Sequence, residues 1–232
     1  SVGSSSVSNM RSDSTREEIA ADYAALREVV SRINAHSYDA LTTPERFTYL
    51  ESLEREMRRL PVAGHELINQ IEGQATPAEI GGKLPHVLAD RLHISRGEAS
   101  RRITDARALG PRQTLSGEPL APRYAATAAA QRAGHIGASH IAVIHRFFDE
   151  LPCWVDAPTR EAAEADLARW AGEQRPEGLR KTADRLTCYL NPDGQFNDQD
   201  RARRRGLTLG TQDCHGMSRL SGWLTPEARA TW

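Results

Sequence analysis

Arginine and hydroxyl side chains recur at helical spacing between Ser95 and Leu109, and these residue types donate hydrogen bonds to bases and phosphates. The polar face of this predicted helix carries Arg96, Ser100, Arg101 and Thr104. The opposite, apolar face carries Ala99, Ile103 and Ala106. One apolar face and one arginine-rich face predict a helix that packs on a core and presents its other side to duplex DNA.

Two short predicted helices, joined by a tight turn, would position that polar face. Residues 84–92 carry apolar side chains at helical spacing after Pro85, which suits a first helical turn. Ser95 is a favourable N-cap for the second helix, and Glu98 completes an S-x-x-E capping box. The pattern over residues 84–109 is that of a helix-turn-helix, whose second helix enters the major groove with its N-terminal residues first. Ser95 therefore joins the four polar residues as a candidate for DNA contact.

The segment is basic within a chain of nearly balanced charge. Residues 83–112 hold seven basic and three acidic side chains, a net charge of +4, whereas the whole chain has a formal net charge of −1. The candidates for phosphate contact are Arg91, Arg102, Arg107 and Arg112. A second basic patch consists of Arg201, Arg203, Arg204 and Arg205. The second patch is either a phosphate contact or a solvated junction, and the overall balance requires any nucleic-acid binding to come from local patches.

One position departs from the usual helix-turn-helix pattern. The turn commonly needs a positive φ, which glycine supplies without strain, but His93 occupies that position here. An ordinary pair of antiparallel helices with a solvated basic face is therefore the alternative interpretation of residues 84–109.

Other spacings do not predict a catalytic or metal site in this sequence. His135, His140 and His145 recur every five residues, whereas ligands on one helical face stand three or four apart. Asp213, Cys214 and His215 are better explained as turn residues than as a nucleophile with its base. We therefore expect no catalytic residue, no metal ligand and no cofactor in this part of the protein, and a self-contained enzyme is disfavoured.

The fold class expected is mainly α, a multi-helix domain with a small C-terminal β-hairpin. The expected divisions are a vector remnant over 1–9, a helical subdomain over 10–112, a second helical subdomain over 122–190, a β-hairpin over 205–225 and the start of a truncated helix over 226–232. A first helix over 14–36 is expected to begin with a capping box of Ser14 and Glu17.

Apolar residues at heptad-like spacing in the first two predicted helices leave a second function open. The first helix carries Ile19, Tyr23, Leu26, Val30 and Ile33, and the second carries Phe47, Leu50, Leu53, Met57 and Leu60. These residues could pair with a second copy of the chain. The alternative to DNA binding is therefore a protein-interaction or dimerisation module without direct nucleic-acid contact.

The cysteine spacing and the length of the apolar segments indicate the cellular compartment. Cys153, Cys188 and Cys214 fit no metal-binding spacing, and an odd, sparse cysteine count suits a reducing compartment. No apolar segment is long enough to span a membrane, and no signal peptide is evident. We therefore expect a cytoplasmic protein without a membrane partner.

Three segments together resemble the actinobacterial 13E12-repeat proteins. They are LADRLHISRGEASRRITDARALGPR, LSGEPLAPRYAATAAAQRAGHIGASHIAVIHRFFDELP and GMSRLSGWLTPEARAT. In that family these segments belong to a mostly helical N-terminal domain of unknown function, which commonly precedes a C-terminal HNH endonuclease domain. The resemblance implies a DNA context and a divalent metal in the HNH domain. It assigns no catalytic residue here, because the family's HNH histidines and asparagine would lie beyond Trp232.

Overall fold

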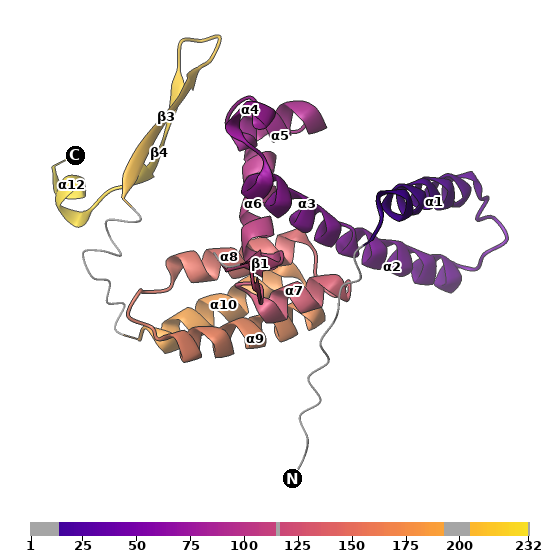
Figure 1. The fold of residues 1–232 in the computed structure, drawn as a ribbon. Helices are drawn as coiled ribbons and strands as arrows, with labels where there is room; N and C mark the ends of the chain where they lie inside the picture. The colour runs from indigo at the N-terminus through magenta and orange to yellow at the C-terminus, as the bar shows by residue number, and fades with distance from the viewer. Residues whose placement is uncertain (1–13, 115–116, 193–204, 232) are drawn as a thin grey trace. The chain divides into compact units, whose positions relative to one another are not determined.

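The computed structural model describes residues 14–114, 117–192 and 205–231, and it confirms a mainly helical fold with a small C-terminal antiparallel sheet (Figure 1). The helices are α1 (Arg16–Ala35), α2 (Thr43–Arg59), α3 (Pro61–Gln74), α4 (Pro77–Ile80), α5 (Leu84–Leu92), α6 (Arg96–Leu109), α7 (Ala125–Arg132), α8 (Ala138–Glu150), α9 (Ala157–Glu173), α10 (Pro176–Leu190) and α12 (Pro226–Ala230). The strands are β1 (Arg112–Gln113), β2 (Pro119–Leu120), β3 (Gly206–Gln212) and β4 (Ser218–Trp223). The chain divides after Leu50 into two compact units. The segment predicted as a vector remnant lies outside the described residues.

Helix α1 begins one residue later than the sequence predicted. Thr15, not Ser14, is the N-cap, and its side chain and that of Glu18 form the reciprocal capping box. Both pairs satisfy the same S/T-x-x-E rule, so the sequence alone does not distinguish them. None of the side chains in α1 or α2 is buried.

Helices α3, α5 and α6 share a small hydrophobic core. Its buried residues are Ile68, Leu88, Ala89, Ala99, Ile103 and Ala106. Alanines at the crossing let the helix backbones approach closely, and the half-buried Leu84 and Ile94 close the edges of the cluster. This cluster is what fixes the orientation of α6.

A larger core lies among α7, α8, α9 and α10 (Figure 1). Ile136, Ile144 and Leu167 are each 0% exposed at its centre. Glu164 of α9 binds the N-terminal end of α7, because its carboxylate accepts hydrogen bonds from the Thr127 amide (2.6 Å) and hydroxyl (2.5 Å). A buried carboxylate paired in this way satisfies otherwise orphaned helix donors and links two helices of the core.

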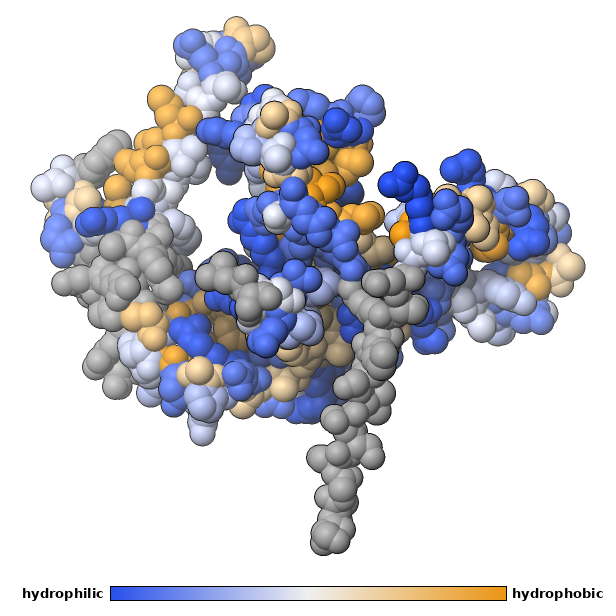
Figure 2. All heavy atoms as spheres, in the orientation of Figure 1, coloured by the Kyte–Doolittle hydropathy of each residue, from blue (hydrophilic) through white to orange (hydrophobic). Residues whose placement is uncertain are grey.

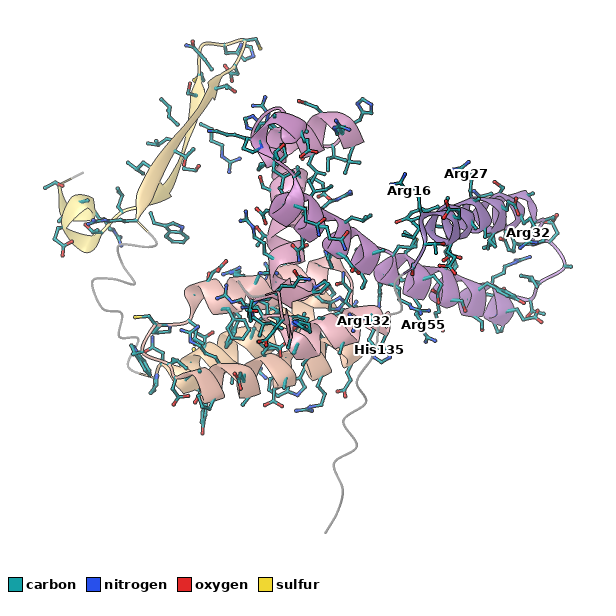
Figure 3. All side chains as sticks on the ribbon, viewed as in Figure 1. Arg16, Arg27, Arg32, Arg55, Arg132 and His135 are labelled. Carbon is teal, nitrogen blue, oxygen red and sulfur yellow. The ribbon has the colours of Figure 1, made fainter. Side chains whose placement is uncertain are left out.

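The C-terminal end of α2 is bound to the turn between α7 and α8. Arg58 donates a hydrogen bond to the carbonyl of His135 (3.0 Å), and Arg59 donates one to the carbonyl of Arg132 (3.2 Å). Figure 3 labels Arg55, Arg132 and His135 at this junction. Gly134 has a φ of 77°, and a Cβ at this position would collide with Arg55. The close approach and the positive φ together explain the glycine.

The C-terminal hairpin is confirmed, with β3 antiparallel to β4 and Leu209 opposite Leu220. At its turn, the Asp213 carboxylate accepts hydrogen bonds from the amides of His215 and Met217, both at 2.9 Å. These bonds explain Asp213 as a turn residue. Apolar side chains of the hairpin are exposed, as Figure 2 shows along its length. In the part of the chain that the structure describes, no helix is long and apolar enough to cross a membrane.

Candidate nucleic-acid interface

The turn between α5 and α6 has the geometry that the sequence required of it. His93 has φ 51° and ψ 43°, and it is the one non-glycine residue with a positive φ among the described residues. The amide of Ile94 donates a hydrogen bond to the carbonyl of Ala89 (3.0 Å), which closes the end of α5. The prediction that His93 takes the position usual for glycine is therefore confirmed, and the histidine carries the steric cost of its Cβ.

Replacing His93 by glycine is expected to raise the free energy of unfolding by about 0.5–1 kcal/mol, because glycine adopts this backbone conformation without a Cβ clash. Urea unfolding followed by circular dichroism would measure the change. The matched control is His93→Ala, which keeps the Cβ and should give no gain. An H93G variant less stable than the native protein would contradict this explanation of the turn.

The N-terminal end of α6 is only half capped in the predicted manner. The Ser95 hydroxyl accepts a hydrogen bond from the amide of Glu98 (3.1 Å), as expected. The Glu98 carboxylate does not return a bond to Ser95, so that half of the predicted capping box is wrong. It pairs instead with Arg101 and with Nε of Arg102, the latter at 2.9 Å. Two cations within one helical turn compete successfully with the backbone amide for one carboxylate.

The two faces of α6 separate as the sequence predicted. Ala99, Ile103 and Ala106 are buried on the α3 and α5 side. The exposed side carries Arg96, Ser100, Arg101 and Thr104. Among the described residues, none forms an ion pair or a hydrogen bond with the side chain of Arg96. Arg96 therefore presents an uncompensated charge at the first turn of α6.

The other basic residues of the segment divide into free and paired groups. Arg91 and Arg112 are exposed and have no side-chain partner among the described residues. Arg107 forms a two-point ion pair with Glu72 of α3, which raises the pKa of Arg107 and lowers the pKa of Glu72 through the shared hydrogen bonds. Arg102 shares Glu98 with Arg101. Arg91 and Arg112 are consequently more available to a phosphate than Arg102 and Arg107.

The middle of α6, from Arg101 to Asp105, borders a cleft. Arg101 and Thr104 line this cleft together with Arg146 of α8 and with Arg123, which precedes α7. At its wall, His145 Nε2 of α8 lies 3.3 Å from the Asp105 carboxylate of α6. Sequence reasoning missed Arg123 and Arg146, because no local spacing connects them with α6.

The remaining candidates are spread over different surroundings. Arg205 is exposed, whereas Arg201, Arg203 and Arg204 lie outside the described residues. His140 Nε2 lies 2.9 Å from the Gln174 carbonyl within the core, unlike the exposed His135. Within the described ranges, no three or more His, Cys, Asp or Glu side chains gather into a group that could hold a metal ion.

Comparison with known proteins places the chain in a family. Residues 47–232 match the family described as "Domain of unknown function (DUF222)". An uncharacterized Mycobacterium tuberculosis protein, MT1160, is 56% identical over 218 residues, which is 94% of this chain and 52% of that protein. A Mycobacterium bovis protein, Mb1179c, also uncharacterized, is 55% identical over 222 residues, 96% of this chain and 49% of that protein. The chain spans about half the length of these relatives, and no solved structure matches it. The chain belongs to the DUF222 family.

Proposed function

We propose that this chain is the DNA-binding module of a cytoplasmic 13E12-repeat protein that carries an HNH endonuclease domain, and that α6 contacts the major groove of duplex DNA. The observation that carries the proposal is the α5–α6 pair, with a left-handed turn at His93 and an unpaired arginine at the first turn of α6. The resemblance of the three segments to 13E12-repeat proteins supports the nuclease context. The relatives, about twice as long as the chain, have room for a further domain.

The contacts follow from which side chains are exposed and free. Arg96 and Ser100 project from the first two turns of α6, the part of a recognition helix that meets base edges. Arg91 and Arg112, one on α5 and one beyond α6, are available for phosphates on either side. The proposal gives this chain the placement of DNA and assigns the cleavage step to the HNH domain.

Fluorescence anisotropy with a labelled duplex tests the proposal over a series of salt concentrations. Because counterions are released from each neutralised phosphate, the logarithm of the association constant should fall linearly with the logarithm of salt concentration. Saturable binding at low salt, together with a slope of this salt dependence that corresponds to several phosphates, would support the proposal. No salt-sensitive binding to any duplex at low ionic strength would overturn it.

A specific observation also favours the alternative, dimerisation through α1. Its apolar residues are 37–49% exposed, and Ile19 and Ile33 lie seven residues on either side of Leu26. A two-fold axis at Leu26 would therefore pair Ile19 with Ile33 of a second copy in an antiparallel arrangement. The N-terminal half of α1 is the more acidic and its C-terminal half the more basic, which suits antiparallel pairing.

Sedimentation velocity over a range of protein concentrations tests this second candidate. The native chain should form dimers, and Leu26→Glu should abolish them by placing two carboxylates at the axis. Glu28→Gln, a change at a polar position of the same helix, is the matched control and should leave the dimer intact. A native chain that stays monomeric at high concentration would contradict dimerisation, without bearing on DNA binding.

A further inference from the structure

A short β-ribbon of β1 and β2 follows α6 directly, between the two helical subdomains that the sequence predicted. Arg112 pairs with Leu120 and Gln113 with Pro119 in an antiparallel register. The Thr114 amide continues the ribbon by donating a hydrogen bond to the Glu118 carbonyl (2.9 Å). Both strands are exposed on every residue, so the ribbon is not part of a hydrophobic core.

The base of the ribbon is nevertheless held firmly against α3 and α6. The side-chain amide of Asn69 donates hydrogen bonds to the carbonyls of Ala106 (2.8 Å) and Pro111 (3.2 Å). Asn69 thus joins the last turn of α6 to the residue that immediately precedes β1. Gly110 is buried in this junction, and a Cβ there would collide with Asn69 and with the Ala106 carbonyl. An exposed ribbon with a close-packed base is a preorganised projection.

The position of the ribbon along α6 suggests what it meets. A 14-residue helix rises about 20 Å, so the ribbon starts roughly that far from Ser95. Because the N-terminal residues of a recognition helix are the ones that contact base edges, an element at its C-terminal end, roughly 20 Å away, lies outside those base contacts. At that place the DNA presents its sugar–phosphate backbone. Arg112 offers an unpaired guanidinium, and Gln113 an exposed amide, to such a backbone.

We infer that the β1–β2 ribbon is a second DNA-contacting element, in which Arg112 and Gln113 bind the sugar–phosphate backbone beside the groove occupied by α6. Asn69 is a positioning residue, which acts by holding the ribbon at a fixed place relative to α6. The inference rests on the proposed function and extends it from one helix to a helix with an adjoining ribbon. Backbone contacts fix the register of a protein on DNA, while base contacts fix the sequence that it recognises. The ribbon would therefore help α6 to set the register of this module on DNA.

Anisotropy titrations of the intact chain with a labelled duplex test the ribbon. Arg112→Ala should lower the affinity about three- to tenfold and reduce the salt slope by about one. Gln113→Ala should lower the affinity less and leave the slope unchanged, because it removes no charge. Arg180→Ala, which removes an exposed arginine from α10, is the matched control and should bind as the native chain does.

Asn69→Ala gives a readout that a merely structural role would not produce. If Asn69 acts through the ribbon, its effect and that of Arg112→Ala should be less than additive in the double variant. Hydroxyl-radical footprinting should show that Arg112→Ala loses protection at one edge of the footprint only. Because Arg112 is exposed, its replacement leaves the fold intact, and the thermal transition should confirm this.

The possible outcomes distinguish DNA contact through the ribbon from DNA contact through α6 alone. The Arg112 and Gln113 variants could keep full affinity and an unchanged footprint while Arg96→Ala loses affinity. That result would overturn the inference that the ribbon contacts DNA and would leave α6 as the contact. Absence of salt-dependent binding by the native chain would overturn the proposed function, and the ribbon with it. An equal loss of affinity in Arg112→Ala and Arg180→Ala would also overturn the inference, because the effect would then come from the change in net charge.

Discussion

Replacing Arg96 and Arg101 together by alanine is expected to lower the affinity for duplex DNA about ten- to a hundredfold and to flatten its salt dependence. Both side chains are exposed on α6. Arginine contacts with guanine or phosphate are each worth about 1–3 kcal/mol, and each neutralised phosphate contributes close to one unit of salt slope. Anisotropy titrations at several salt concentrations measure both quantities.

The single variants should differ, because the two arginines have different surroundings. Arg96 has no partner among the described residues, whereas Arg101 already pairs with Glu98. Arg96→Ala should therefore cause the larger share of the loss. Arg107→Ala is the matched control on the same helix, since its guanidinium is committed to Glu72, and it should weaken binding least. Equal affinities for the native chain and the R96A/R101A variant would remove α6 from the interface.

Replacing Ile103 by alanine is expected to lower the stability of the α3–α5–α6 core by about 2–4 kcal/mol. Ile103 is 3% exposed at the centre of a core that contains only six buried residues, three of which are alanines. So few large side chains cannot rearrange to fill the cavity that the substitution leaves. Loss of a few kcal/mol is a large fraction of the stability of a natural domain.

Hydrogen exchange resolves which part of the chain is affected. In the Ile103→Ala variant, amides of α5 and α6 should exchange faster, while those of α8 and α9 keep their protection, because the two cores are separate clusters. Ile144→Ala makes the same change in the larger core and should have the opposite distribution. Equal acceleration in both cores by either variant would show that they unfold as one cooperative unit.

Local sequence rules were sufficient for α6 and its turn. Ser95 caps the helix, Ala99 and Ile103 face inward, and His93 takes the positive φ, because each of these features depends on residues within one or two helical turns. The helical fold class and the C-terminal hairpin followed from periodicity in the same way.

Features that depend on distant residues were not predictable from those rules. The pairing of Arg107 with Glu72 and the contact between Asp105 and His145 each join residues 35 or more positions apart. The two strands of the β1–β2 ribbon contain two residues each, which is too short for an alternating pattern. The pairing of Glu98 with Arg101 and Arg102 is local, but the capping rule does not predict it. That rule considers only the N-cap residue and the residue three positions later.

The central claim, that α6 lies against duplex DNA, is tested most directly by hydrogen–deuterium exchange of the intact chain with and without a saturating duplex at low salt. Binding through α6 predicts slower exchange in peptides that cover the turn at His93 and the first turns of α6, with no change in α9 and α10. Protection confined to α9 and α10, or equal exchange of the α6 peptides in both states, would contradict the account.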